Sequence, residues 1–162
     1  MGKGSAKWKF GILYTEGRIK QEKRIFADSA PKNRFHLVVH VWIVNAKGEY
    51  LISQRAASRP SYPLMWECVG GSVLRGESSV DGAVREVKEE VGIDLSPAAG
   101  ILVDSEVRKI VNGTVFNDIK DVWLFPYDGR FCWKTQRPRG GRCKMDDKKR
   151  NKRILPLRQA VN

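Results

Sequence analysis

The chain has 162 residues, of which 41% are hydrophobic and 30% charged, and its formal net charge is +12 at pH 7. This length and apolar content predict one globular domain with a single core and exclude a disordered chain. No apolar run approaches the roughly 18 residues that a membrane helix needs, and the N-terminus lacks a secretory core. We therefore expect a cytoplasmic protein.

The positive charge is concentrated near the C-terminus. Residues 129–162 contain 12 Lys or Arg and 2 Asp or Glu, which leaves 18 of the 30 basic and 16 of the 18 acidic residues for the remainder. A nearly neutral body does not favour nucleic-acid binding by the whole protein. We divide the chain into a domain, residues 1–130, and a basic tail, residues 131–162, which we expect to be poorly ordered.

The first half of the chain is predicted to form strands at five places: 8–14, 18–26, 35–44, 50–55 and 65–69. The third strand is long and apolar enough to lie centrally in a sheet. The turn signal Asn45-Ala46-Lys47-Gly48 predicts that the fourth strand pairs back against it. The fifth strand leads to Gly70-Gly71.

A helix is predicted in the second half of residues 71–93. Apolar residues recur there at three- and four-residue steps and form one stripe: Val80, Ala83, Val84, Val87 and Val91. Ser78 and Asp81 resemble a capping box, and Gly92 suits the left-handed position that ends a helix.

Three glutamates, Glu86, Glu89 and Glu90, project from one narrow face of this helix, away from the valines. Like charges four residues apart cost only about 0.2–0.5 kcal/mol per pair on an exposed helix, so an ordinary acidic surface is one explanation. A metal site is the other, because hard cations take carboxylate oxygens as ligands.

After the helix, residues 101–111 and 114–125 read as strands joined at Asn112-Gly113, a strong hairpin signal. Strands on both sides of a helix predict an α/β fold with a mixed sheet in one domain.

The spacing around the glutamates resembles a known motif. Gly71, five residues, Glu77, seven residues and then Arg85-Glu86 begin it; apolar Val87, Glu89-Glu90, Gly92 and apolar Ile93 complete it. This pattern resembles the Nudix box at every fixed position. The resemblance implies a Nudix hydrolase with an α/β/α sandwich around a mixed β-sheet.

The resemblance also implies a reaction and a site. Nudix enzymes cleave a nucleoside diphosphate linked to another moiety, by water attack on phosphorus, with Mg²⁺ or Mn²⁺. Glu86, Glu89 and Glu90 would hold the metal, with a backbone carbonyl of Gly70 or Gly71 as a further ligand. Arg85 would orient the glutamates, and Glu77 would add a carboxylate at the start of the box.

Residues 35–44, 53–55 and 62–67 resemble the Nudix branch that includes isopentenyl-diphosphate isomerase. Arg55, Tyr62 and Trp66 are therefore candidate substrate-binding residues, the two aromatic ones by stacking, although core packing suits Trp66 better. The expected partner is a small diphosphate compound, without a membrane, and many Nudix proteins form homodimers.

The sequence disfavours isomerase activity. In the isomerase, the catalytic cysteine stands directly before a Gly-His-Pro sequence, five residues after the tryptophan that corresponds to Trp66. Gly71 occupies that place here, and no His-Pro follows. Cys68 lies only two residues after Trp66, and the Nudix box is complete, whereas the isomerase has a degraded box.

The remaining cysteines and histidines indicate no metal site. Cys68, Cys132 and Cys143 include no close pair, so we expect free reduced thiols rather than a zinc site or a disulfide framework. His36 and His40 alternate with apolar residues on one predicted strand, so we expect them to be packed or hydrogen-bonded.

An RNA-binding module is the alternative function. Trp133 lies in the tail among four basic residues that could contact phosphates while the indole stacks on a base: Lys134, Arg137, Arg139 and Arg142.

The tail also suggests a shifted reading frame. Read one nucleotide later, ATG followed by either aspartate codon contains TGG, so Met145-Asp146 must yield a tryptophan. Nudix proteins of this branch usually end in a helix preceded by a segment resembling Glu-x-x-x-Ala-Lys-Trp-Met. A genuine disordered basic tail would explain the composition equally well.

The nucleotide sequence of the gene tests the shifted frame. We expect the shifted frame to stay open across the codons for residues 131–161 and to encode an amphipathic helix. A chain with the frame corrected would then be more stable and more active, since the helix would cover apolar sheet surface. A stop codon in the shifted frame would contradict this prediction.

Overall fold

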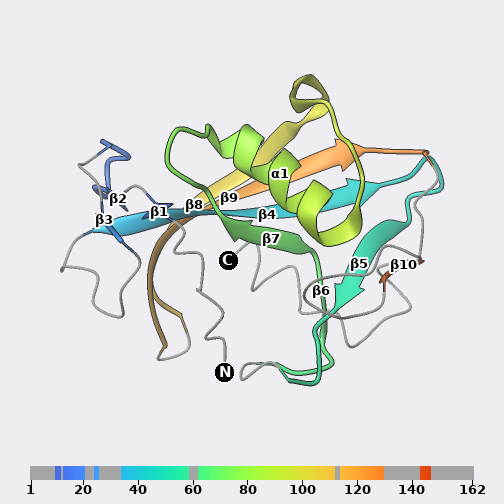
Figure 1. Ribbon diagram of the computed structural model, residues 1–162, viewed down its shortest axis with the longest axis horizontal. Helices are drawn as coiled ribbons and strands as arrows, with labels where there is room; N and C mark the ends of the chain where they lie inside the picture. The colour runs from blue at the N-terminus through green and yellow to red at the C-terminus, as the bar shows by residue number, and fades with distance from the viewer. Residues whose placement is uncertain are drawn as a thin grey trace, which may run out of the picture.

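The computed structural model describes residues 10–11, 13–20, 24–25, 34–58, 62–111, 114–129 and 143–146. Within these residues, helix α1 (Ser79–Val91) lies across one face of a sheet (Figure 1). A 3₁₀ turn, Pro97–Ala99, follows the helix. The strands are β1 (Phe10–Gly11), β2 (Leu13–Tyr14), β3 (Arg24–Ile25), β4 (Phe35–Val44), β5 (Tyr50–Gln54), β6 (Trp66–Glu67), β7 (Val69–Ser72), β8 (Ile101–Val111), β9 (Thr114–Pro126) and β10 (Cys143–Asp146).

The main sheet is mixed, as the sequence predicted. Its strand order is β10-β5-β4-β9-β8, with β2 and β7 paired to β4 and β6 paired to β5, while β1 and β3 form a separate pair. Strands β4 and β9 run parallel over a register from His36–Asp118 to Val44–Pro126, and the other pairings of the main sheet are antiparallel. The parallel pair therefore forms the centre of the sheet.

Alternate residues of β4 face the helix and build the main core. Phe35, Leu37, Val39, Val41 and Ile43 are all at most 5% exposed and join Val69, Val87 and Phe125 in one apolar cluster. Because successive side chains of a strand point to opposite faces, His36, His40 and Trp42 lie on the other face. Strand β4 thus separates the apolar layer under α1 from a second, more polar layer.

The predicted ends of α1 are confirmed. The Ser78 side chain accepts a hydrogen bond from the Asp81 backbone N–H, and the Asp81 carboxylate accepts one from the Ser78 N–H. Gly92 has φ 73°, a conformation that glycine adopts without the strain of a Cβ. These caps place the start and end of α1 within the sequence motif.

A buried carboxylate fixes the N-terminus of α1 to the sheet. Asp121 of β9 accepts hydrogen bonds from the Arg18 guanidinium at 2.7 and 2.8 Å, from Ser79 at 2.6 Å and from Ser105 at 2.7 Å. Burial alone would raise the pKa of Asp121, but these three donors lower it. Asp121 therefore joins the turn at Arg18, strand β8 and the first residue of α1.

The face of the sheet opposite α1 carries a small apolar cluster and two ion pairs. Trp42, Ile52 and Val122 form the cluster. Arg108 binds Asp118 through two hydrogen bonds of 2.8 and 2.7 Å, and Lys120, with no exposed surface, lies 2.8 Å from Glu106. Cations buried with their partners on this face raise the local positive potential around His40.

The structure differs from the sequence prediction in two strands. The strand predicted at 65–69 is split into β6 and β7, and β7 continues through Gly70-Gly71, which pair with His40 and Val39. Strand β10 lies inside the predicted basic tail and pairs with β5. The rest of that tail, including Trp133, lies outside the described residues, as does the Asn112-Gly113 turn, and the boundary at residue 130 stays a prediction.

The predicted α/β/α arrangement has one helical layer in the part of the chain that the structure describes. Helix α1 covers one face, and no second α-helix is found among these residues. Within the same residues, no helix is long and apolar enough to cross a membrane.

Acid should destabilise the fold through His40. Burial, Arg108 and Lys120 lower the pKa of His40 to about 4 from 6.5, so its contribution to stability is present above pH 6.5 and is lost as the pH falls through 4. A shift of this size corresponds to about 3 kcal/mol. In urea unfolding between pH 7.5 and 4, His40→Gln should lose correspondingly less free energy of unfolding than the parent. Equal losses in the two proteins would contradict this assignment.

Candidate functional site

Strand β7 and helix α1 meet at Gly71 and Glu86. A Cβ added to Gly71 would lie 2.3 Å from both Cδ and Oε1 of Glu86. The carboxylate therefore rests directly against the strand backbone, where only glycine leaves room for it. Glu86 is 2% exposed, so the strand and the helix enclose a carboxylate that their separate sequences do not reveal as buried.

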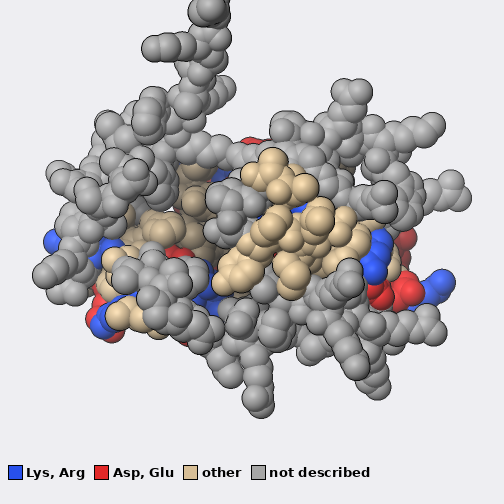
Figure 2. Space-filling model, turned by 90° about the horizontal axis from the view of Figure 1, so that it is seen from below, with Lys and Arg blue, Asp and Glu red and all other residues tan. Residues whose placement is uncertain are grey.

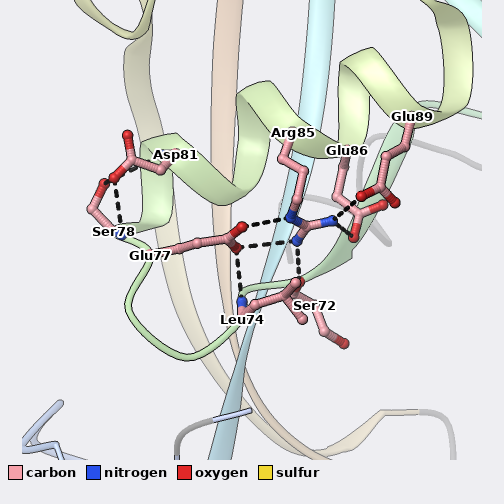
Figure 3. Close-up of polar contacts among 8 residues, drawn as sticks. All are labelled: Ser72, Leu74, Glu77, Ser78, Asp81, Arg85, Glu86 and Glu89. Carbon is pink, nitrogen blue, oxygen red and sulfur yellow. Dashed lines mark hydrogen bonds and ion pairs between the residues drawn. The ribbon is translucent and has the colours of Figure 1, made fainter. Parts of the chain in front are cut away.

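The guanidinium of Arg85 holds the acidic groups together (Figure 3). It donates to Glu77 through Nε at 2.6 Å and Nη2 at 3.2 Å, and to Glu86 Oε1 through Nη1 at 2.8 Å. Nη2 also donates to the Ser72 carbonyl at 2.8 Å. Burial alone would lower the pKa of Arg85, but the hydrogen bonds to Glu77 and Glu86 raise it, so Arg85 is a permanent cation.

Glu77 closes the loop between β7 and α1. Its Oε2 accepts a hydrogen bond from the Leu74 backbone N–H at 2.8 Å while the same carboxylate pairs with Arg85. Glu77, predicted as a further carboxylate of the motif, thus holds the loop against the helix.

Glu89 and Glu90 lie one turn beyond Glu86. Glu89 is within 3.3 Å of Arg85 Nη1, and its side chain is 44% exposed. The pKa of the Cys68 thiol is raised to about 12, chiefly by burial and also by the negative charges of Glu67 and Glu90.

The three glutamates fit a divalent cation. Glu86 Oε2 is buried and has no hydrogen-bond partner in the described structure, and a buried unpaired carboxylate oxygen is costly unless a cation binds it. Carboxylates also suit Mg²⁺ and Mn²⁺ chemically. Among the residues described, no three Asp, Glu, His or Cys side chains converge closely enough to hold a metal ion. Arg85 supplies the positive charge beside Glu86 and Glu89.

Two of the three candidate substrate residues, Arg55 and Trp66, lie on opposite faces of the sheet. Arg55 contacts Glu67. Glu67, Val69 and Gly71 are two residues apart in turn and therefore share the α1 side. Trp66 belongs to the apolar cluster on the opposite face, where Lys144 Nζ lies 4.6 Å from its ring centroid. This placement favours core packing for Trp66.

Tyr62, the third of these candidates, lies in the loop before β6 and is 62% exposed, with φ 51°.

The sequence interpretation did not single out Glu67, the partner of Arg55. Its two-residue spacing from Val69 and its four-residue spacing from Gly71 were the available signal, because residues at these spacings share one face of a strand.

The NUDIX domain model matches residues 34–158, so the chain belongs to the Nudix family. Members of this family generally use divalent metal ions. The match includes every glutamate of the site and extends through β10.

Two curated relatives are similar over part of the chain. Isopentenyl-diphosphate Delta-isomerase of Escherichia coli O139:H28 is 33% identical over 100 residues, which are 60% of this chain and 55% of the isomerase. A Nudix hydrolase of Listeria innocua, named as uncharacterized, is 40% identical over 88 residues, 52% of each chain. The chain thus spans about half the length of the curated relatives it matches.

Two solved structures share the fold. A protein of Deinococcus radiodurans has a TM-score of 0.59 at 21% identity and covers 83% of this chain and 82% of its own. The dihydroneopterin triphosphate pyrophosphohydrolase of Escherichia coli has a TM-score of 0.52 at 22% identity and covers 70% of this chain and 82% of its own. Identities this low show a common fold only.

Replacing Gly71 with alanine should displace Glu86. The new methyl group would overlap the carboxylate, and overpacking of this kind costs about 1–3 kcal/mol. We expect Gly71→Ala to lower the free energy of unfolding by that amount in urea titrations. Gly17→Ala is the matched control, because a Cβ at Gly17 meets only Thr15 Oγ1, at 3.9 Å. Equal stabilities for the two variants would contradict the close approach.

Proposed function

We propose that this protein hydrolyses the diphosphate linkage of a nucleoside diphosphate joined to another moiety, with Mg²⁺ or Mn²⁺ as cofactor. The observation that carries the proposal is the buried Glu86 carboxylate, which lies against Gly71 with one oxygen unpaired. Membership of the Nudix family supports the reaction class. The substrate would be a small molecule.

Each residue of the site has a role in this proposal. Glu86, Glu89 and Glu90 would hold the cation, with a carbonyl of Gly70 or Gly71 beside them. Arg85 keeps Glu86 in place through its 2.8 Å hydrogen bond, and Glu77 fixes Arg85 from the other side. A bound divalent cation supplies positive charge for the phosphate oxygens and lowers the pKa of a water ligand.

The geometry does not favour an isomerase that depends on a cysteine. Cys68 lies in the apolar cluster opposite α1 with a pKa raised by burial to about 12, so its thiol stays protonated near neutral pH. At Gly71, where the sequence comparison would require the catalytic cysteine, a side chain would collide with Glu86. Both observations support hydrolysis.

The face drawn in Figure 2 gives RNA binding no specific support. Figure 2 shows one face of the molecule, on which acidic and basic side chains lie close to one another toward both ends, with other residues between them. Mixed signs of this kind do not provide the phosphate-binding stripe that nucleic acid needs. The basic residues around Trp133 lie outside the described part, so this alternative rests on their composition alone.

Removing single carboxylates should test the metal site. Glu89→Gln and Glu90→Gln should each lower Mg²⁺-dependent turnover by orders of magnitude and weaken Mg²⁺ binding, because an amide is a poorer ligand for a hard cation. Circular dichroism should show an intact fold for both. Glu16→Gln is the control, since Glu16 pairs with Lys109 and is exposed.

The assay begins with a screen of diphosphate-linked nucleosides in the presence of Mg²⁺, read by the release of phosphate and monophosphates. Near-normal turnover by both variants at Glu89 and Glu90 would refute the assignment of the ligands. A parent protein that cleaves no compound in the screen would argue against the proposed function itself.

A further inference from the structure

Arg55 and Glu67 form an ion pair on the side of the sheet that α1 covers. Strand β6 pairs with β5 in the register Gln54–Trp66 and Ser53–Glu67. Glu67, Val69 and Gly71 point to the α1 side, and Gly71 contacts Glu86 there. Glu67 therefore lies on the side of the sheet that carries the acidic site.

A specific contact joins Arg55 to Glu67. Arg55 Nη1 donates to both carboxylate oxygens of Glu67, at 3.0 and 2.8 Å. The Arg55 and Glu67 side chains are 23% and 29% exposed, respectively. The pair is thus formed but open to solvent, so a ligand can reach the guanidinium without unfolding the strands around it.

The energetics allow a phosphate to replace Glu67. A partly exposed ion pair stabilises a protein only weakly, since solvent screens the two charges. A diphosphate offers Arg55 more negative charge and several oxygens in a geometry that suits the planar guanidinium. A phosphate would therefore compete with Glu67 for Arg55, whereas Arg85 is bound by Glu77, Glu86 and the Ser72 carbonyl.

We propose that Glu67 is the counter-ion of Arg55 and that a phosphate of the substrate displaces it, so that Glu67 positions Arg55 and limits the affinity for phosphate. This inference rests on the proposed function, because it assigns Arg55 and Glu67 to the same diphosphate site. Glu67 acts through Arg55 in this arrangement and needs no contact with the substrate.

Binding of methylenediphosphonate, a diphosphate analogue with a carbon bridge that resists hydrolysis, tests the proposal. Isothermal titration calorimetry with Mg²⁺ present should give a dissociation constant about two- to five-fold lower for Glu67→Gln than for the parent. Arg55→Gln should raise it about tenfold or more. Loss of a structural contact alone would not increase affinity, so the direction of the Glu67 effect is diagnostic.

Two further proteins separate this coupling from a general charge effect. In the double variant Arg55→Gln/Glu67→Gln, the gain from Glu67→Gln should vanish. Asp94→Asn removes one negative charge at the end of α1, where Asp94 pairs with Lys88, and should leave affinity unchanged. A gain in the double variant, an equal gain in Asp94→Asn or weaker binding by Glu67→Gln would overturn the proposal.

The outcome is independent of turnover. If the parent does not bind the analogue, the proposal for Glu67 fails even if the screen detects hydrolysis. If the analogue binds with the expected pattern but the screen detects no hydrolysis, the binding role stands and the proposed function fails.

Discussion

The arrangement of the site depends on the guanidinium of Arg85. This one cation bonds the carboxylate before α1, the buried carboxylate on α1 and the backbone of β7. Without it, Glu77 and Glu86 would face each other as like charges, and the loss of one partner of a buried pair costs about 3–5 kcal/mol. The loop, the helix and the strand can approach one another because Arg85 satisfies all three.

The alternation of side chains along a strand determines which residues share one face of the sheet. Glu67 and Gly71 lie on the α1 side, where Gly71 contacts Glu86, whereas Trp66 and Cys68 pack against the apolar cluster on the other face. A shift of one residue in the register of β6 would exchange these sets. The pairing of β6 with β5 therefore decides which residues lie on the side of Glu86 and which stay in the apolar cluster.

Much of this could be predicted from the sequence, because the signals are local. The apolar run of β4, the capping box at Ser78 and the left-handed Gly92 depend on neighbouring residues, and each prediction matches the structure. The burial of Glu86 and the contact between Arg55 and Glu67 depend instead on segments that only the folded sheet brings together. The strand at Gly70-Gly71 was missed because two glycines resemble a loop, although pairing with β4 holds them extended.

The parallel pairing of β4 with β9 has a consequence for how the molecule assembles. His36 pairs with Asp118, and helix α1 lies in the chain between these partners. Closing so long a segment costs entropy before any contact repays it, which makes topologies of this kind slow to fold. On the ribosome, the edge of β4 that pairs with β9 must wait unpaired until β9 has emerged. Because Ser79 donates to Asp121 of β9, the N-terminus of α1 is anchored only when the two central strands have joined.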